Sequence, residues 1–328
     1  MDLSIIVPIY NVEEYVRPCM ESLFRQGLDE ECFEIIAVND GSTDNSIKVI
    51  EDLVEKHHNI SIINQSNQGL SVARNTGIAK SSGTYILFVD SDDLLIDNTL
   101  SALLQEALKS RPDMLVADYV KMDNQQIENR KFPSSDCTFQ STTGTELFLH
   151  QLDPRACYVT NKLYNRAFLN KNHLCFTPGI YFEDIPFTTA CYLSAGSCIK
   201  SNCSFYIYRQ RTSSICSSIN IRKIFDLNTV LALLKDIIAS KPDLEDCQRR
   251  QVEEVMFATF SIALWYTVSD LQLFEQRKVI IKDLQGKVPD LYFSNTIKQR
   301  IVSMVFRAMP CTYLSVRRLL GRLTKSFK

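Results

Sequence analysis

Three carboxylates crowd the end of one apolar segment of this sequence. Residues 85–89 (YILFV) have the pattern of a buried strand, and Asp90, Asp92 and Asp93 follow it directly. Like charges this close repel one another, and ionised groups beside a core are costly unless something pairs with them. The pattern therefore indicates a binding site for a cation that is not part of the chain.

The segments that must position these carboxylates alternate in type along the first part of the chain. Short apolar runs rich in β-branched residues predict buried strands, and the stretches between them show helical spacing. Such alternation predicts right-handed crossovers and a mainly parallel, Rossmann-like sheet flanked by helices, which is an α/β fold. The predicted strands are residues 3–9, 33–38, 60–63, 85–89 and 114–119, and residues 144–151 and 160–169 are expected to be helical.

Other polar candidates follow these predicted strands. In an open parallel sheet, ligands bind beyond the carboxyl ends of the strands, so residues far apart in sequence meet there. Tyr10 follows the first strand, Asp40 follows the second, and Arg74 lies one turn into the helix that begins after Gly69. An aromatic ring and a carboxylate suit a nucleotide base, and a guanidinium suits phosphate. This edge is therefore expected to bind a nucleotide.

Four motifs in this part of the chain resemble those of a known family. VPIYN, VNDGSTDNS, NQGLSVARNTGI and FVDSDD occur in the order and spacing of family 2 inverting glycosyltransferases with the GT-A fold. The resemblance is dense over residues 1–100 and thinner up to about residue 210. A lone D-x-D would be weak evidence, whereas four ordered motifs are specific.

The resemblance implies a nucleotide-diphosphate sugar as donor, usually a UDP-sugar. Asp40 would accept a hydrogen bond from uracil N3–H, and Pro8 and Tyr10 would frame the base. Arg74 would lie near the base or the diphosphate, and Lys162 would assist with the diphosphate or the acceptor. The residues assigned to the donor are Pro8, Tyr10, Asn11, Asp40, Asn67, Gly69, Arg74, Asp90, Ser91 and Lys162.

The resemblance also implies a divalent metal at the D-x-D motif. Asp92 would hold the metal, and Asp90 would face the ribose and contribute as a second ligand. Mg²⁺ or Mn²⁺ is commonly held by one or two carboxylates together with substrate phosphates. The metal would neutralise the diphosphate as it leaves. Asp93 is expected either to support these ligands or only to begin the next helix.

The catalytic base is implied by a downstream E-D motif. In the stretch YFEDIPF, Asp184 would deprotonate the acceptor hydroxyl, with Glu183 as its neighbour or substitute. The alternative is that both acids only begin a helix, where they complement its dipole. The processive members of the family carry Q-x-x-R-W after this motif, but the only tryptophan here, Trp265, lies in LWYTV. Transfer of a single sugar is therefore expected.

The domain organisation follows from the fading of strand signals near residue 215. Residues 1–215 are predicted to form the GT-A catalytic domain, and residues 216–328 a helical region that ends in a basic amphipathic tail. Residues 291–328 carry eight Lys/Arg and no Asp/Glu, whereas the other 290 residues carry 38 acids against 28 bases. This tail either packs on the protein with its cations in solvent or lies on an anionic membrane surface. A nucleic-acid partner is not expected.

The resemblance implies a metal-dependent, inverting glycosyltransferase that moves one sugar from a nucleotide-diphosphate donor to a hydroxyl of a bacterial surface glycan, either free or lipid-linked. With neither a signal peptide nor a long apolar run, it is expected in the cytoplasm or on the inner face of the plasma membrane. The alternatives are a non-catalytic nucleotide-sugar sensor, a nucleotidyltransferase and a membrane-surface scaffold. The sequence leaves the sugar, the acceptor and the oligomeric state open.

Overall fold

The computed structural model describes residues 1–129, 137–150, 157–211 and 219–326. The chain divides into two compact units. The first comprises Met1–Leu147, Tyr158–Gly179 and Ala190–Ser214. The second comprises Phe148–Cys157, Ile180–Thr189 and Ile215–Lys328. The boundary predicted near residue 215 lies outside the described residues.

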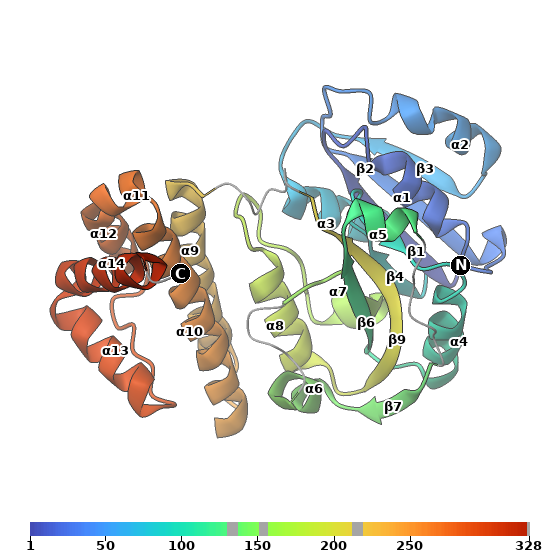
Figure 1. Ribbon diagram of the computed structural model, residues 1–328. Helices are drawn as coiled ribbons and strands as arrows, with labels where there is room; N and C mark the ends of the chain where they lie inside the picture. The colour runs from blue at the N-terminus through green and yellow to red at the C-terminus, as the bar shows by residue number, and fades with distance from the viewer. Residues whose placement is uncertain (130–136, 151–156, 212–218, 327–328) are drawn as a thin grey trace. The chain divides into compact units, whose positions relative to one another are not determined.

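In the residues that the structure describes, the first unit is built on one nine-stranded sheet (Figure 1). Its strands are β1 (Leu3–Ile9), β2 (Phe33–Asn39), β3 (Ile60–Asn64), β4 (Tyr85–Phe88), β5 (Leu94–Leu95), β6 (Met114–Met122), β7 (Phe139–Thr142), β8 (Lys162–Asn165) and β9 (Cys198–Arg209). The order is β3-β2-β1-β4-β8-β6-β9-β5, and β7 pairs with β9. The first four strands are mutually parallel, as predicted.

Helices cover both faces of this sheet because the strands are apolar on both sides. The helices up to residue 194 are α1 (Val16–Leu23), α2 (Glu51–Lys56), α3 (Leu70–Lys80), α4 (Leu100–Ser110), α5 (Asn124–Glu128), α6 (Gly144–His150), α7 (Arg166–Lys171) and α8 (Asp184–Ser194). Leu3, Ile5 and Val7 pack in one core with residues of α1 and α4. Ile6 meets α3, where a Cβ atom on Gly77 would lie 2.3 Å from its Cγ2. Only glycine therefore lets α3 lie this close.

One predicted helix is wrong in its first half. Residues 162–165, expected to be helical with the rest of 160–169, form β8, which pairs antiparallel with both β4 and β6. The helix α7 begins only at Arg166, after Asn165 caps it by accepting a hydrogen bond from the Phe168 N–H. The sheet is therefore parallel over β1 to β4, and β8 joins it through antiparallel pairs to the parallel pair β6–β9, whose strand β9 also pairs antiparallel with β5 and β7.

The second unit contains the helices of the C-terminal part, as predicted. They are α9 (Ile221–Ser240), α10 (Asp246–Ser269), α11 (Leu271–Glu275), α12 (Arg277–Lys287), α13 (Ile297–Ala308) and α14 (Pro310–Ser326). Leu227 of α9, Tyr266 of α10 and Ile280 of α12 belong to one buried core. Within the described residues, no helix has both the length and the apolarity that crossing a bilayer requires.

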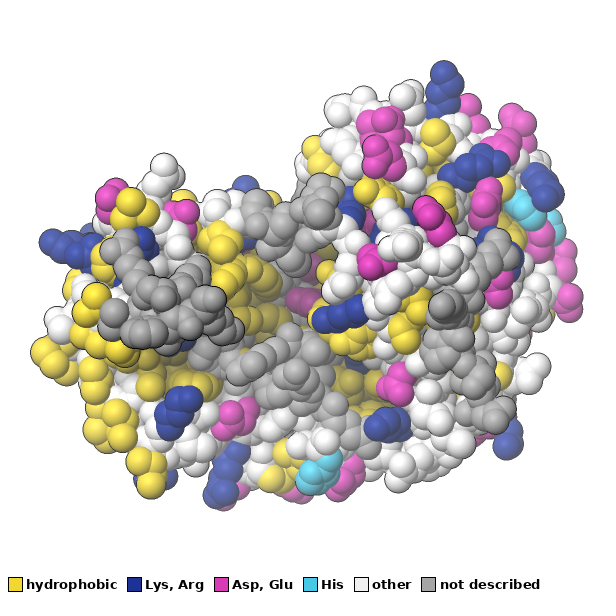
Figure 2. Space-filling view, viewed as in Figure 1, with side chains coloured by type: hydrophobic (Ala, Val, Ile, Leu, Met, Phe, Trp, Pro, Cys, Tyr) yellow, Lys and Arg dark blue, Asp and Glu magenta, His cyan; other side chains and the backbone are white. Residues whose placement is uncertain are grey.

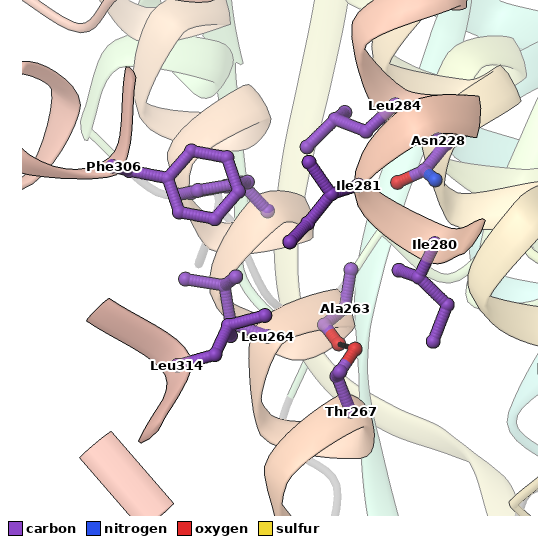
Figure 3. Close-up of a pocket in the computed structure, with 10 residues that line it drawn as sticks. Asn228, Ala263, Leu264, Thr267, Ile280, Ile281, Leu284, Phe306 and Leu314 are labelled. Atoms are coloured by element: carbon purple, nitrogen blue, oxygen red, sulfur yellow. Dashed lines mark hydrogen bonds between the residues drawn. The ribbon is translucent and has the colours of Figure 1, made fainter. Parts of the chain in front are cut away.

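A small apolar cavity lies inside this second unit. Phe306, Leu314 and Ile281 are among its lining residues, and their side chains surround a common space (Figure 3). Its volume is about 10 Å³, which is close to the minimum that holds one water molecule. The cavity is therefore a packing feature of the core and has no room for a sugar or a nucleotide.

Candidate active site

The ends of β1 and β2 meet at one edge of the sheet. Ile9 pairs in register with Asn39, and the Asp40 N–H donates to the Ile9 carbonyl at 2.9 Å. Pro8 is buried in β1, whereas Tyr10, two residues on, is 48% exposed. The tyrosine ring is therefore open to a ligand, and the proline fixes the backbone that carries it.

Asp40 organises the loop that leads into α3. Its Oδ1 accepts hydrogen bonds from Gln65 Nε2 at 2.7 Å and from the Gln68 N–H at 2.9 Å, and its Oδ2 accepts from the Gly69 N–H at 2.8 Å. The side chain is only 3% exposed. A carboxylate can accept about four hydrogen bonds, so these three leave capacity for one more.

Gly41 lets the two loops of this edge touch. It has φ +73°, and a Cβ atom there would lie 2.8 Å from the backbone nitrogen of Asn67. Asn11, at φ 51°, joins the same loops because its Oδ1 accepts a hydrogen bond from the Thr43 N–H at 2.8 Å. Asn67 is exposed and Gly69 is partly buried. The structure thus brings Tyr10, Asn11, Asp40, Asn67 and Gly69 to one edge.

Asp90 is paired with a cation of the chain itself. The Arg74 Nη2 lies 2.7 Å from Asp90 Oδ1, and the guanidinium stacks 5.2 Å from the centre of the Phe176 ring. The Arg74 side chain is 3% exposed, whereas Asp90 is 30% exposed. Arg74 is therefore a fixed charge that holds Asp90 at the surface of the site.

Asp92 is paired with a second cation that the sequence did not point to. The Arg211 Nη2 lies 2.7 Å from Asp92 Oδ2, and the guanidinium lies 5.0 Å from the centre of the Tyr15 ring. The Nε of Arg211 is buried and has no hydrogen-bond partner among the described residues. Even so, burial and the neighbouring Asp90 raise the pKa of Asp92 above its usual range.

Asp93 is buried and tethers the end of β9 to the carboxylate turn. Its Oδ2 accepts a hydrogen bond from the Tyr206 hydroxyl at 2.6 Å, and its Oδ1 accepts from the Arg209 N–H at 2.8 Å. Burial, and then the charges of Asp92 and Asp90, raise the pKa of Asp93 well above its usual range. Of the two roles expected for Asp93, the structure favours support of its neighbours, because its side chain faces inward.

The carboxylate turn has a donor set that fits Mg²⁺ or Mn²⁺. Asp90 and Asp92 offer hard oxygen ligands, which are the ligands that Mg²⁺ and Mn²⁺ prefer. Among the described residues there is no cluster of three or more His, Cys, Asp or Glu side chains able to hold a metal. The site therefore suits a cation that takes its remaining ligands from phosphate oxygens and water.

Two further residues that were predicted to bind the nucleotide-sugar are buried in the first unit. Ser91 is 5% exposed and lies between the two carboxylates of the D-x-D motif. Lys162 begins β8, and its ammonium donates to the Tyr158 carbonyl and, at 2.6 Å, to Asn161 Oδ1. At 2% exposure, Lys162 is fixed by these internal contacts. Its role toward the diphosphate or the acceptor stays a prediction.

Glu183 and Asp184 belong to the second unit. Glu183 is 7% exposed, whereas Asp184 begins α8 and is only partly buried. Phe182, directly before them, has φ 64°, which is a strained conformation for a bulky residue. The Tyr181 N–H donates to Asp226 Oδ2 at 3.1 Å and so fixes the segment to α9. The two acids differ in exposure, as expected for adjacent residues that point apart.

Sequence reasoning missed the cations and the hydroxyl that surround the carboxylates. Tyr206, Arg209 and Arg211 come from the end of β9, more than 110 residues after Asp90. The signal in the sequence was YRQR, in which one arginine ends β9 and the other lies two residues beyond it. It pointed to no partner because the position of β9 in the sheet could not be deduced from the sequence.

The Tyr206 hydroxyl should contribute measurably to stability. Tyr206→Phe removes the donor to buried Asp93, so we expect a loss of about 2 kcal/mol in the free energy of unfolding, because a buried carboxyl oxygen loses its partner. Tyr164→Phe is the matched control, because that buried hydroxyl donates to a neutral carbonyl, that of Val159, at 3.3 Å. It should cost about 1 kcal/mol. Urea denaturation measures both, and equal losses would contradict the role given to Asp93.

The Arg211–Asp92 pair should compete with metal binding. Arg211→Ala removes the counter-ion of Asp92, so we expect Mn²⁺ alone to bind about tenfold more tightly, which corresponds to about 1.4 kcal/mol. Arg211→Lys keeps the positive charge and should change the affinity much less. Isothermal titration with Mn²⁺ and no nucleotide measures this, and unchanged or weaker binding to Arg211→Ala would show that the pair does not compete.

Comparison with known proteins identifies the family. The profile of "Glycosyl transferase family 2" matches residues 4–172, which is 169 of the 328 residues, and the chain belongs to this family. The resemblance inferred from the four motifs is thereby confirmed. The uncharacterized glycosyltransferase EpsJ of Bacillus subtilis (strain 168) is 36% identical over 219 residues, which cover 65% of this chain and 62% of EpsJ.

Solved structures confirm the GT-A fold with its helical C-terminal part. The crystal structure of S. aureus TarS 1-349 in complex with UDP-GlcNAc has a TM-score of 0.74 at 23% identity, covering 99% of this chain and 92% of that chain. Full-length TarS of Staphylococcus aureus (strain Mu50 / ATCC 700699), a poly(ribitol-phosphate) beta-N-acetylglucosaminyltransferase, is 29% identical over 77% of this chain and 43% of its own length. The mannosyltransferase PcManGT of Pyrobaculum calidifontis, in complex with GDP-Man and Mn²⁺, has a TM-score of 0.53 at 13% identity, covering 97% of this chain and 86% of that chain.

Proposed function

We propose that this chain is a metal-dependent, inverting glycosyltransferase that moves one sugar from a UDP-sugar to a hydroxyl group of a bacterial surface glycan. One observation carries the proposal: in a family 2 chain, parallel strands bring Tyr10, Asp40 and the Asp90–Asp93 turn to the same edge of the sheet. Ligands of open parallel sheets bind at that edge. The edge offers an aromatic ring, a hydrogen-bond acceptor and a place for a cation.

The donor base would lie between the ends of β1 and β2. Tyr10 is exposed and suits stacking, Pro8 shapes the backbone beneath it, and Asp40 retains the capacity to accept one hydrogen bond from uracil N3–H. Asn11, Asn67 and Gly69 shape the loops around this position. The UDP-GlcNAc complex of TarS, which has the same fold, supports UDP as the nucleotide.

The diphosphate would lie over the carboxylate turn. A divalent cation held by Asp92, with Asp90 beside it, would supply positive charge where the leaving group becomes negative. Arg211 would add positive charge to the same end of the donor, because its guanidinium lies beside Asp92. Mn²⁺ in the PcManGT complex supports this cation only at the level of the shared fold.

Asp184 would act as the catalytic base. It is less buried than Glu183, and the strained Phe182 holds the pair in a conformation that an ordinary helix start does not require. Strain of this kind persists where the surrounding structure enforces it, and it clusters at functional sites. A base on the acceptor side of the sugar gives inversion, because the hydroxyl attacks from the face opposite the leaving diphosphate.

The acceptor class rests on the relatives. TarS is named for transfer to poly(ribitol-phosphate), a polymer, which supports a glycan or a lipid-linked glycan as acceptor here. A cytoplasmic location follows from the need for a nucleotide-sugar donor and stays a prediction.

The proposal is tested by donor cleavage without an acceptor. UDP-, GDP-, dTDP- and CMP-sugars are incubated with the protein, with and without Mn²⁺, and slow hydrolysis is followed by chromatography. We expect cleavage of one UDP-sugar, only with metal. Binding of UDP is measured in parallel by titration calorimetry. If the protein bound no nucleotide, the assignment of the sheet edge as the donor site would be overturned. If it bound UDP tightly but turned over no donor with any glycan acceptor, the non-catalytic nucleotide-sugar sensor would be favoured.

A further inference from the structure

The helix α13 exposes its apolar face. Ile297, Ile301, Met304 and Val305 recur at the spacing i, i+4, i+7 and i+8, which places them on one side of the helix. Their exposures are 76%, 55%, 57% and 38%. Figure 2 shows hydrophobic side chains gathered along the edge of this unit that α13 forms in Figure 1. A surface helix of a globular protein normally buries such a stripe.

The opposite side of α13 is polar and is held firmly inward. Gln299 Nε2 donates to both carboxylate oxygens of Glu254 at 2.9 Å, and Ser303 Oγ accepts from the Phe293 N–H at 2.9 Å. Phe306 packs edge-on against Phe260 with ring centres 5.0 Å apart and lines the small cavity of the core (Figure 3). These contacts fix the rotation of the helix, so its apolar face points outward by construction.

Basic residues border the exposed stripe on both sides. At about 100° per residue, Lys298 lies along one border, and Arg300 and Arg307 lie along the other. All three are exposed, and in the described part of the chain none of them forms an ion pair. From residue 291 to 328 there are eight Lys/Arg and no Asp/Glu. The surface is thus apolar at its centre and positive at its edges.

The next helix also exposes apolar side chains. Met309, between α13 and α14, is 54% exposed, and Val316 and Leu319 of α14 are 50% and 59% exposed. Val316 and Leu319 are three residues apart and so share one face of α14. The apolar stripe of α13, formed by Ile297, Ile301, Met304 and Val305, is called the C-terminal face below, together with its basic border.

We propose that the C-terminal face binds the surface of an anionic lipid bilayer. A helix that lies in a membrane interface buries its apolar stripe below the headgroups, while flanking Lys and Arg reach the lipid phosphates. Each such cation contributes attraction to an anionic leaflet. A second copy of this chain is a poorer partner, because a symmetric interface would bring the two sets of unpaired cations together. The proposal is independent of the sugar-transfer reaction.

Vesicle flotation tests the proposal on the full chain. The vesicles contain either phosphatidylcholine alone or equal parts of phosphatidylcholine and phosphatidylglycerol. We expect binding to the anionic vesicles that weakens with salt, and little binding to the neutral ones. Lys298→Gln and Arg307→Gln should each weaken anionic binding about fivefold.

Matched variants separate this face from general surface hydrophobicity. Ile301→Ser should weaken vesicle binding about tenfold, the size expected for loss of one buried aliphatic side chain. Val279→Ser is the control, because Val279 of α12 is 56% exposed against 55% for Ile301 and lies outside the face. Both residues are exposed, so both variants should fold, which circular dichroism checks. Equal effects of the two variants, or no binding of the wild type, would overturn the proposal.

Self-association of the chain through the same face must be distinguished from membrane binding. Light scattering of the lipid-free protein shows whether it forms dimers, and Ile301→Ser shows whether the C-terminal face mediates them. A dimer that depends on Ile301, together with failure to bind anionic vesicles, would assign the face to a second copy of the chain and overturn the membrane proposal.

Discussion

Asp184→Asn is expected to lower kcat by about a thousandfold while donor binding persists. The asparagine keeps the shape of the side chain but cannot accept the proton of the acceptor hydroxyl, and general base catalysis contributes about 10²–10⁴-fold. The proposed donor contacts are made by other residues, among them Tyr10 and Asp40 at the ends of β1 and β2. The measurement is the turnover of the UDP-sugar identified in the donor screen, together with UDP affinity by calorimetry.

Glu183→Gln is the matched neighbour for this test. Glu183 is buried, whereas Asp184 is partly exposed, so the Gln variant should retain far more activity than Asp184→Asn. A large loss in Glu183→Gln with activity kept in Asp184→Asn would exchange the two roles. Activity kept in both variants would remove the E-D pair from catalysis and leave the acids as a helix start.

Asp92→Asn is expected to abolish metal-dependent donor cleavage, with a loss of about 10²–10³-fold in kcat. The substitution removes the carboxylate proposed to hold the cation, so the charge that stabilises the departing diphosphate is no longer positioned. Mn²⁺ affinity in the presence of UDP should fall in parallel. Turnover over a range of Mn²⁺ concentrations and Mn²⁺ titration of the UDP complex provide the two measurements.

Asp97→Asn controls for the loss of a carboxylate in the same region. Asp97 pairs with Arg25 at 2.8 Å and is not part of the D-x-D motif, so its amide should leave both turnover and Mn²⁺ binding unchanged. If Asp92→Asn turned over donor normally without added metal, the cation would not be needed and Arg211 or Arg74 would supply the positive charge alone.

Much of the sheet edge could be predicted from the sequence. The apolar runs at residues 3–9, 33–38 and 85–89 define parallel strands, and such strands end at a common edge. The placement of Tyr10 beside Asp40 follows from this rule alone. The need for a positive partner could be predicted as well, because three carboxylates after a buried strand repel one another unless a cation pairs with them.

The identity of the partners in the structure depended on the fold. Arg74 and Arg211 pair with Asp90 and Asp92, so the chain supplies positive charges that were expected only from outside. Arg211 reaches Asp92 because β9 returns to the sheet beside β6 and ends near the carboxylate turn. Strand order depends on long-range pairing, which leaves no local signal in the sequence.

The strand β8 also could not be predicted from local sequence, because it depends on long-range pairing. Residues 162–165 have no strong preference of their own, and a helix was expected over 160–169. In the fold they lie between β4 and β6 and satisfy the hydrogen bonds of both neighbours. Pairing on two sides outweighs the weak local propensity of four residues.

The helix α13 shows most clearly which features the sequence determines and which the tertiary structure determines. The sequence by itself determined that the C-terminal tail, to which α13 belongs, is helical and amphipathic, because the apolar period is a local property. Only the tertiary structure decided which side faces the core. Phe306, Gln299 and Ser303 find fixed partners inside, and this side of the helix is therefore buried while the more apolar stripe stays outside. Complementary packing and hydrogen bonding, which involve residues far away in sequence, set that orientation.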